Sequence, residues 1–116
     1  MKEILKNRTK KFASDCWKLC SKFPISREYN AYCNQLIRCS SSVGANYRAA
    51  WRDKTKAYFI QKLKIVEKKA DESMYFLELF SEITDKEKNE ISRLHKEANE
   101  VLSIIVSSIK TVKSRK

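Results

Sequence analysis

The stretch from Ser41 to Phe80, SSVGANYRAAWRDKTKAYFIQKLKIVEKKADESMYFLELF, decides the fold of this 116-residue chain. It contains two runs in which apolar residues recur at helical spacing, and the basic segment RDKTK joins them. The whole chain has one glycine and one proline beside many Lys, Glu, Ala, Leu and Ile residues. These common residues lose little side-chain freedom in a helix, whereas Gly and Pro interrupt it. We therefore expect an all-α protein.

Working outward from this stretch, apolar residues recur in steps of three and four along residues 2–22, 27–51, 55–81 and 85–113. Short connections between such helices make neighbours antiparallel. We predict a single domain over residues 1–116, an antiparallel up-down-up-down four-helix bundle. Its core stripes are Leu5, Phe12, Cys16, Leu19 and Phe23, then Tyr29, Cys33, Leu36, Ser40, Val43, Tyr47 and Ala50, then Phe59, Leu63, Val66, Ala70, Leu77 and Phe80, and finally Ile91, Leu94, Ala98, Val101 or Leu102, Ile105, Ile109 and Val112.

The predicted helix starts carry capping residues. Ser26 follows the proline of FPISRE and precedes the second helix, and Thr55 precedes the third. Thr84 and Glu87 have the spacing of a capping box, which predicts a fourth helix that begins near residue 85. Gly44 lies inside the second helix, where it costs about 1 kcal/mol relative to Ala. We therefore expect another helix to pass close to Gly44.

The four cysteines are expected to be reduced packing residues. Cys16 and Cys20 are one helical turn apart, a geometry that suits a disulfide poorly, and Cys33 and Cys39 lack the Cys-x-x-Cys spacing of a structural zinc site. The only histidine, His95, has Ser92 three residues before it, so the Glu-x-x-His motif of diiron bundles is missing. We predict neither a metal nor a cofactor.

Catalysis is not expected either. The pairs Glu87 with Glu90 and Glu97 with Glu100 have the i,i+3 spacing of Mg²⁺-binding carboxylates in all-α pyrophosphohydrolases. However, the first pair lies in the predicted first turn of a helix, where negative charge suits the helix dipole. Serine, lysine and cysteine nucleophiles lack a neighbouring base. We therefore predict a protein that is not an enzyme.

The charge is large and unevenly distributed. The net charge is +11, of which residues 1–56 carry +9 and residues 110–116 carry +4, whereas residues 57–109 carry −2. Such a surface favours association with a polyanion, because each cation at a phosphate releases condensed counterions. The candidates for phosphate contact are Arg8, Lys10, Lys11, Lys18, Lys22, Arg38, Lys54, Lys110, Lys113, Arg115 and Lys116.

Two other interpretations of this charge stay open. A charged face can serve solubility alone, and a basic surface can attract anionic lipid, although that favours a helix free to lie flat on the membrane. No zinc finger, compact helix-turn-helix or strand with stacking aromatics is present to read bases. Any nucleic-acid binding is therefore expected through the phosphate backbone of RNA or DNA, with weak sequence preference. No apolar run is long enough for a signal peptide or membrane span, which predicts a cytoplasmic protein without a membrane partner.

The segments ANYR, FIQKLKIVEKKADES and YFLEL, in this order, resemble the central signature of a bacterial four-helix-bundle family. The family comprises proteins encoded in intervening sequences of 23S rRNA genes, also called S23-like, and the resemblance extends over essentially the whole chain. It implies a homopentameric ring without enzymatic activity. A more distant likeness to the accessory proteins of diversity-generating retroelements implies a basic pentamer that binds nucleic acid and a reverse transcriptase.

The resemblance also singles out individual residues. Arg48 and Arg52 can pair with acids of the antiparallel third helix or contact phosphate, and both alternatives stay open. This chain departs from the family in having Phe76 where Trp is common and in having Trp51. The positions that match the family are Asn46, Tyr47, Arg48, Arg52, Lys62, Glu67, Asp71 and Glu72.

Homo-oligomer formation requires an exposed apolar side on the bundle. The aromatic residues that lie off the main core stripes are the interface candidates, namely Trp17, Trp51, Tyr58, Tyr75 and Phe76. The sequence thus supports two hypotheses. The first is a non-enzymatic oligomer that binds RNA or DNA, and the second is an oligomeric scaffold that binds a protein partner and uses its charge for solubility only.

Overall fold

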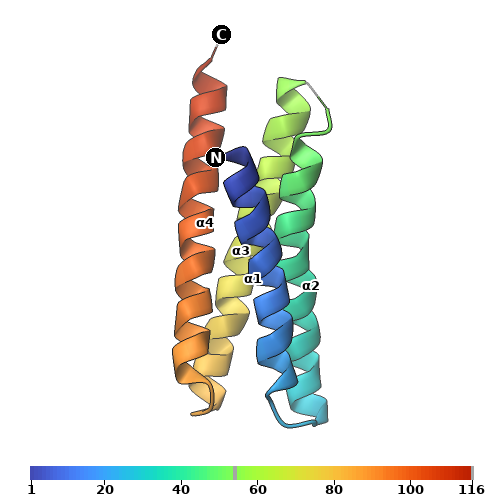
Figure 1. Ribbon diagram of the computed structural model, residues 1–116, viewed down its shortest axis with the longest axis vertical. Helices are drawn as coiled ribbons and strands as arrows, with labels where there is room; N and C mark the ends of the chain where they lie inside the picture. The colour runs from blue at the N-terminus through green and yellow to red at the C-terminus, as the bar shows by residue number, and fades with distance from the viewer. Residues whose placement is uncertain (54, 116) are drawn as a thin grey trace.

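Four antiparallel helices make up the computed structural model, which describes residues 1–53 and 55–115 (Figure 1). They are α1 (Lys2–Ser21), α2 (Arg27–Ala50), α3 (Lys56–Ile83) and α4 (Lys88–Ser114). Each helix packs against its neighbours in the chain, and α1 also contacts α4, so the bundle closes with the predicted up-and-down topology. The molecule measures 51 × 20 × 20 Å. Within the described residues, none of the helices combines the length and apolar character that crossing a lipid bilayer requires.

The core consists of two clusters of buried side chains along the bundle axis. At the end that holds both tight interhelical turns, aromatic rings dominate, and the Phe23 and Phe80 rings stack with centroids 4.6 Å apart. Towards the chain termini, aliphatic residues dominate, including Leu5, Val43 and Leu63. The predicted stripes are confirmed, except that Tyr29, Phe59 and Val112 are only half-buried.

The helix starts follow the predictions at two of three sites. The Ser26 and Thr55 hydroxyls accept hydrogen bonds from the amides of Tyr29 and Tyr58, as expected of N-caps. The capping box before α4 is wrong. The Thr84 hydroxyl instead accepts from the amide of Lys86, which closes a turn, so α4 begins only at Lys88. Glu87, the residue before it, adopts a left-handed conformation with φ of 58°.

The close helix approach predicted at Gly44 is present. A Cβ atom at this position would lie 3.4 Å from the backbone carbonyl and the hydroxyl oxygen of Thr9 on α1. The Thr9 hydroxyl is buried and donates to the Leu5 carbonyl at 2.8 Å, so it needs no partner from α2. α1 and α2 therefore run close together here, and this contact forms the floor of a surface groove.

Candidate nucleic-acid interface and end pocket

Three of the predicted phosphate-binding cations are held by carboxylates of the same molecule. Arg8 binds Glu97 with two hydrogen bonds of 2.7 and 2.9 Å, and it also reaches Glu100 at 3.3 Å. Lys11 pairs with Asp15 at 3.0 Å, and Lys22 pairs with Glu87 at 3.5 Å. The Lys11 pair lies within α1, whereas the pairs of Arg8 and Lys22 connect α1 and its C-cap with α4 and its N-cap. These three cations are therefore partly neutralised as candidates for phosphate contact.

Asp15 is the buried member of a small charged cluster between α1 and α4. Its side chain is 9% exposed and accepts from Arg93 at 2.9 Å and from Lys11 at 3.0 Å. Burial alone would raise the pKa of this carboxyl, but the hydrogen bonds from Arg93 and Lys11 outweigh burial and lower the pKa. The neighbouring Glu90 also has a lowered pKa, chiefly because Arg93 donates to it. The cluster is therefore fully charged at neutral pH.

Stability is expected to decrease in acid because of this cluster. The pKa of Asp15 is lower in the folded than in the unfolded chain, so its contribution is present above the unfolded value of about 3.9 and is lost as the pH falls through the folded value. Replacing Asp15 by Asn removes one charged partner, which is worth about 1.5 to 3 kcal/mol for a hydrogen bond to a charged group. Urea unfolding between neutral pH and pH values of about 3 measures both effects.

The Asp15→Asn variant is expected to lose less stability between these two pH values than the unaltered protein loses. Replacement of the exposed Asp85, whose one ion pair with the described residues is a 3.9 Å contact with Lys88, serves as the control. Equal acid sensitivity of the unaltered protein and Asp15→Asn would contradict this assignment.

A groove between α1 and α2 gathers three cations that form no ion pair with the described carboxylates. Its volume is about 400 Å³, and Lys6 and Lys10 of α1 and Arg48 of α2 line it together with Glu3. Within residues 1–53 and 55–115, Lys6, Lys10 and Arg48 form no ion pair. Small residues between these cations leave room for the groove, namely Ala13, Ser41, Gly44 and Ala45. We call it the α1–α2 groove.

The other predicted cations are dispersed over the surface. Lys10 belongs to the α1–α2 groove, and Arg115 lies at the far end of α4. Lys54 and Lys116 lie outside the described residues. The remaining ones are exposed and form no ion pair within the part of the chain that the structure describes, namely Lys18, Arg38, Lys110 and Lys113. Sequence reasoning missed Lys6, although its i,i+4 spacing to Lys10 was a usable signal.

The two arginines of the family motif do not clamp α3. Within residues 1–53 and 55–115, neither Arg48 nor Arg52 pairs with an acid of that helix, and Glu72 pairs instead with Lys69 at 3.3 Å. The reason is rotation of α2, because Arg48 lines the groove on the α1 side of the helix. Arg52 is exposed in the connection to α3.

The other motif residues have separate structural surroundings. Tyr47 is buried, and burial raises its pKa. The Asn46 amide donates to the Ser42 carbonyl one turn earlier at 2.9 Å. The Lys62 ammonium lies 5.6 Å from the centroid of the Tyr58 ring. Glu67 is half-buried and Asp71 is exposed.

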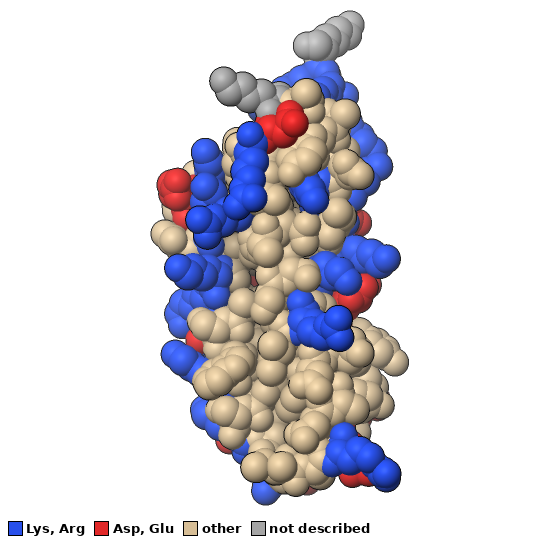
Figure 2. Space-filling view, turned by 90° about the vertical axis from the view of Figure 1, so that its right-hand side faces the viewer, with Lys and Arg blue, Asp and Glu red and all other residues tan. Residues whose placement is uncertain are grey.

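The aromatic residues predicted as interface candidates do not form one continuous surface. Tyr75 is 57% exposed and lies against Phe76, which in turn contacts Tyr32 with ring centroids 6.0 Å apart. Together with the half-buried Leu79, these residues form an uncharged surface on α2 and α3, which we call the α2–α3 apolar face. Figure 2 shows that uncharged residues fill the middle of the lower half of this side, while Lys and Arg lie above it, along its left edge and at its lower right. Trp17 is 60% exposed but lies on α1.

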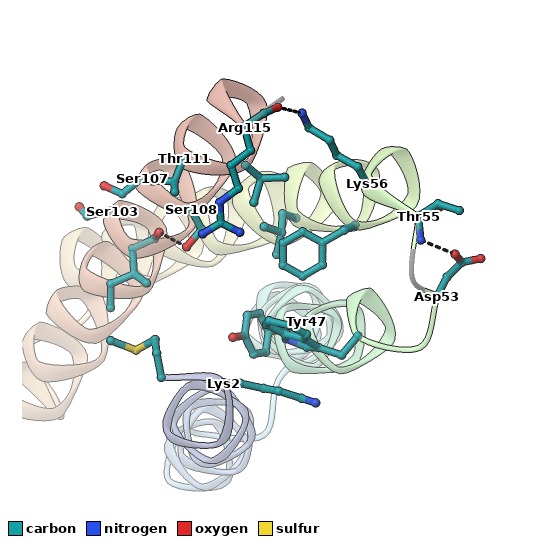
Figure 3. A pocket seen from close by; sticks show the side chains of 16 residues that line it. Lys2, Tyr47, Asp53, Thr55, Lys56, Ser103, Ser107, Ser108, Thr111 and Arg115 are labelled. Carbon is teal, nitrogen blue, oxygen red and sulfur yellow. Dashed lines mark hydrogen bonds between the residues drawn. The ribbon is translucent and has the colours of Figure 1, made fainter.

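A cavity opens at the end of the bundle where α1 begins and α4 ends. Its volume is about 870 Å³, and the starts of α1 and α3 and the ends of α2 and α4 line it. Its apolar wall includes the Trp51 ring, which packs against Phe59 with centroids 4.8 Å apart and lies under the Lys2 ammonium at 4.9 Å. Figure 3 shows Tyr47 on one side of this space and Arg115 reaching over it from α4. We call it the end pocket.

The four cysteines are free thiols, as expected, and three are fully buried. Burial raises the pKa of Cys16 to about 12. It also raises the pKa of Cys20, Cys33 and Cys39. Such thiols carry almost no thiolate at neutral pH, so they are poor nucleophiles.

Comparison with known proteins identifies a family and a similar solved structure. The sequence pattern of the family described as "23S rRNA-intervening sequence protein" matches residues 2–107. The crystal structure of a protein of unknown function from the S23 ribosomal protein family of Bacteroides thetaiotaomicron VPI-5482 is similar, with a TM-score of 0.83 and 28% sequence identity. The match covers 95% of this chain and 99% of that one. None of the curated proteins matches the chain.

Proposed function

Because the chain belongs to the 23S rRNA-intervening sequence protein family, we propose that it is a non-enzymatic homo-oligomer, pentameric as the family resemblance implies, that binds RNA or DNA through phosphate contacts. A cytoplasmic location is part of this proposal. So is the possibility that the oligomer also binds a protein, for which a reverse transcriptase is the candidate implied by the distant likeness to retroelement accessory proteins.

The α1–α2 groove is the observation that carries the nucleic-acid proposal. Lys6, Lys10 and Arg48 converge there over small residues, so a phosphate can approach the helix surfaces closely. These three cations form no ion pair with a carboxylate in the described residues, whereas Arg8, Lys11 and Lys22 do. Phosphate contacts of this kind fix position without reading bases, in agreement with the lack of a base-reading motif.

The α2–α3 apolar face supports the oligomer. Uncharged aromatic residues such as Tyr75 and Tyr32 are costly to leave in water, and aromatic residues are enriched in the cores of protein interfaces. The face lies on α2 and α3, whereas Lys6 and Lys10 of the groove come from α1. A ring closed through the apolar face therefore leaves the cations of α1 available.

The test combines fluorescence anisotropy with light scattering. Labelled single-stranded RNA, duplex DNA and a structured RNA are titrated with the protein at low salt, and the mass of the free protein is determined in the same buffer. We expect binding at micromolar concentration or tighter by an oligomer, with little difference among sequences of one nucleic-acid type. No binding at low salt by a well-formed oligomer would rule out the proposal for nucleic acid.

The oligomer is tested separately with Tyr75→Glu, which puts a charge on the α2–α3 apolar face. This variant is expected to have the mass of a monomer or a smaller assembly, because an unpaired charge is costly in an apolar interface. Gln61→Glu, an exposed position on the same helix outside the apolar face, is the matched control and is expected to keep the mass of the unaltered protein. A monomeric unaltered protein would contradict the proposal for assembly.

A further inference from the structure

The end pocket has the shape and charge of a binding site for a helix. We propose that it binds a short amphipathic α-helix of a partner protein that carries acidic residues beside an apolar stripe. This inference goes beyond the proposed nucleic-acid binding, because it concerns a different surface and a different class of partner. It rests on the lengths of the four helices, on the lining of the pocket and on its charge.

The pocket exists because two helices of the bundle are shorter than the other two. α1 and α2 have 20 and 24 residues, whereas α3 and α4 have 28 and 27. The start of α1 and the end of α2 are level, since the Lys2 ammonium lies 4.9 Å from the ring of Trp51, the C-cap of α2. Figure 1 shows that α3 and α4 extend past both at this end. The ends of α3 and α4 are therefore uncovered on the side of α1 and α2, and one or two turns of another helix can pack there.

The walls of the pocket suit helix packing. Apolar surface comes from Trp51, the C-cap of α2, and from Phe59 and Leu63 of α3. Ile104 and Val112 add apolar surface from α4. On α4, three small hydroxyl residues follow one another at intervals of four, so they lie on one helix face and permit a second helix to approach closely. These residues are Ser103, Ser107 and Thr111, and they lie in a row along α4 in Figure 3.

The charge around the pocket selects an acidic partner. Lys2, Lys56 and Arg115 line it, and among its described lining residues only Asp53 is acidic. The Asp53 carboxylate already accepts from the Thr55 amide at 2.8 Å. Lys2 lies over the Trp51 ring, and Lys56 donates to the backbone carbonyl of Arg115, so their described partners are neutral. A helix with Asp or Glu beside its apolar stripe complements this rim.

The experiment uses Trp51 as the reporter. The chain has two tryptophans, so Trp17→Phe leaves Trp51 as the only one, and its fluorescence reports occupation of the pocket. The probe is a synthetic peptide of about 15 residues with leucines at i, i+3, i+4 and i+7 and glutamates between them. One control peptide has the same composition without an apolar face, and a second has lysine in place of glutamate.

We expect the acidic amphipathic peptide to shift the Trp51 emission to shorter wavelength with saturation, and the two control peptides to leave it unchanged. Lys2→Glu with Arg115→Glu is expected to weaken binding about tenfold, because each reversal removes an attraction and adds a repulsion. Lys64→Glu with Lys96→Glu makes the same charge change away from the pocket and is expected to alter affinity less than about twofold. Thr111→Phe narrows the pocket and is expected to abolish the shift in Trp51 emission. Ser21→Phe, at the other end of the bundle, is expected to leave that shift unchanged.

Several results would overturn the inference. Equal shifts with the acidic and basic peptides would show that charge does not select the partner. The same shift with an RNA oligonucleotide would assign the pocket to the nucleic-acid interface. A Trp51 that iodide cannot quench in the free oligomer would show that another copy of the chain already occupies the pocket. Failure of the peptide to bind while RNA binding persists would overturn this inference alone and leave the proposed function intact.

Discussion

The affinity of the protein for a labelled RNA is expected to fall about a thousandfold when the salt concentration rises from about 50 to about 200 mM. This loss corresponds to roughly six phosphate contacts, each of which releases a condensed counterion. The α1–α2 groove is expected to supply three of these contacts, through Lys6, Lys10 and Arg48. Replacing all three with Glu should therefore reduce the slope of log affinity against log salt by about two to three units. Anisotropy titrations at four or more salt concentrations measure the slope.

A second triple variant separates this groove from a general effect of charge. Lys64, Lys68 and Lys96 are exposed on α3 and α4, and replacing them with Glu changes the net charge by the same amount. Only the nonspecific, long-range part of the attraction is lost in that variant, so its slope should stay close to that of the unaltered protein. Equal slopes for the two triple variants would contradict the assignment of binding to the groove.

The second large effect is expected at the centre of the aromatic core. Phe80 is 0% exposed and its ring contacts those of Phe23, Tyr29 and Tyr32, with the nearest centroid at 4.6 Å. Replacing Phe80 by Ala should lower the free energy of unfolding by about 3 to 5 kcal/mol, because it removes buried apolar surface and leaves a cavity. Urea unfolding followed by circular dichroism measures the change. The protein concentration must be held constant, since assembly adds to the apparent stability.

The control for Phe80→Ala is Tyr75→Ala, which truncates another aromatic residue of α3 that is 57% exposed. In a monomer this change is expected to stay within about 0.5 kcal/mol, the usual range for surface substitutions. In an oligomer, Tyr75→Ala is expected to weaken assembly through the α2–α3 apolar face, which changes how the unfolding midpoint depends on protein concentration. A loss below about 1 kcal/mol for Phe80→Ala would contradict the described core.

The fold could be predicted from the sequence because helix, core and connection follow from local patterns. Every buried position of the four stripes lies on 3- and 4-residue steps, and Ser26 and Thr55 cap helices through residues three positions later. The predicted capping box at Thr84 was wrong because a threonine hydroxyl can either close a turn or cap a helix. Which of the two it does here depends on the backbone conformation at Glu87. Local patterns therefore gave the elements correctly and one boundary incorrectly.

The candidate site was less predictable because it depends on how the helices are rotated. From the sequence, Arg48 could pair with an acid of the third helix or contact phosphate, and only the packed bundle places it beside Lys6 and Lys10. The sequence also contained no sign that Arg8 is paired, because its partner Glu97 lies 89 positions later in the chain. In the fold, an Arg8 guanidinium nitrogen donates to a Glu97 carboxylate oxygen at 2.7 Å. The end pocket has no local signal either, since it arises where the longer helices α3 and α4 extend past α1 and α2.

The contact between α1 and α4 differs in kind from the other helix contacts, and this has a consequence for motion. It is the smallest of the four contacts, and ion pairs span it, with Arg8 reaching Glu97 and, about two turns further along α1, Arg93 reaching Asp15. Local opening of a protein starts where the apolar contact is smallest. Amide hydrogens of α1 should therefore exchange with solvent before those of α2, α3 or α4. α1 forms one side of the α1–α2 groove. Partial unfolding of α1 would therefore separate Lys6 and Lys10 from Arg48, while α2, α3 and α4 stay folded.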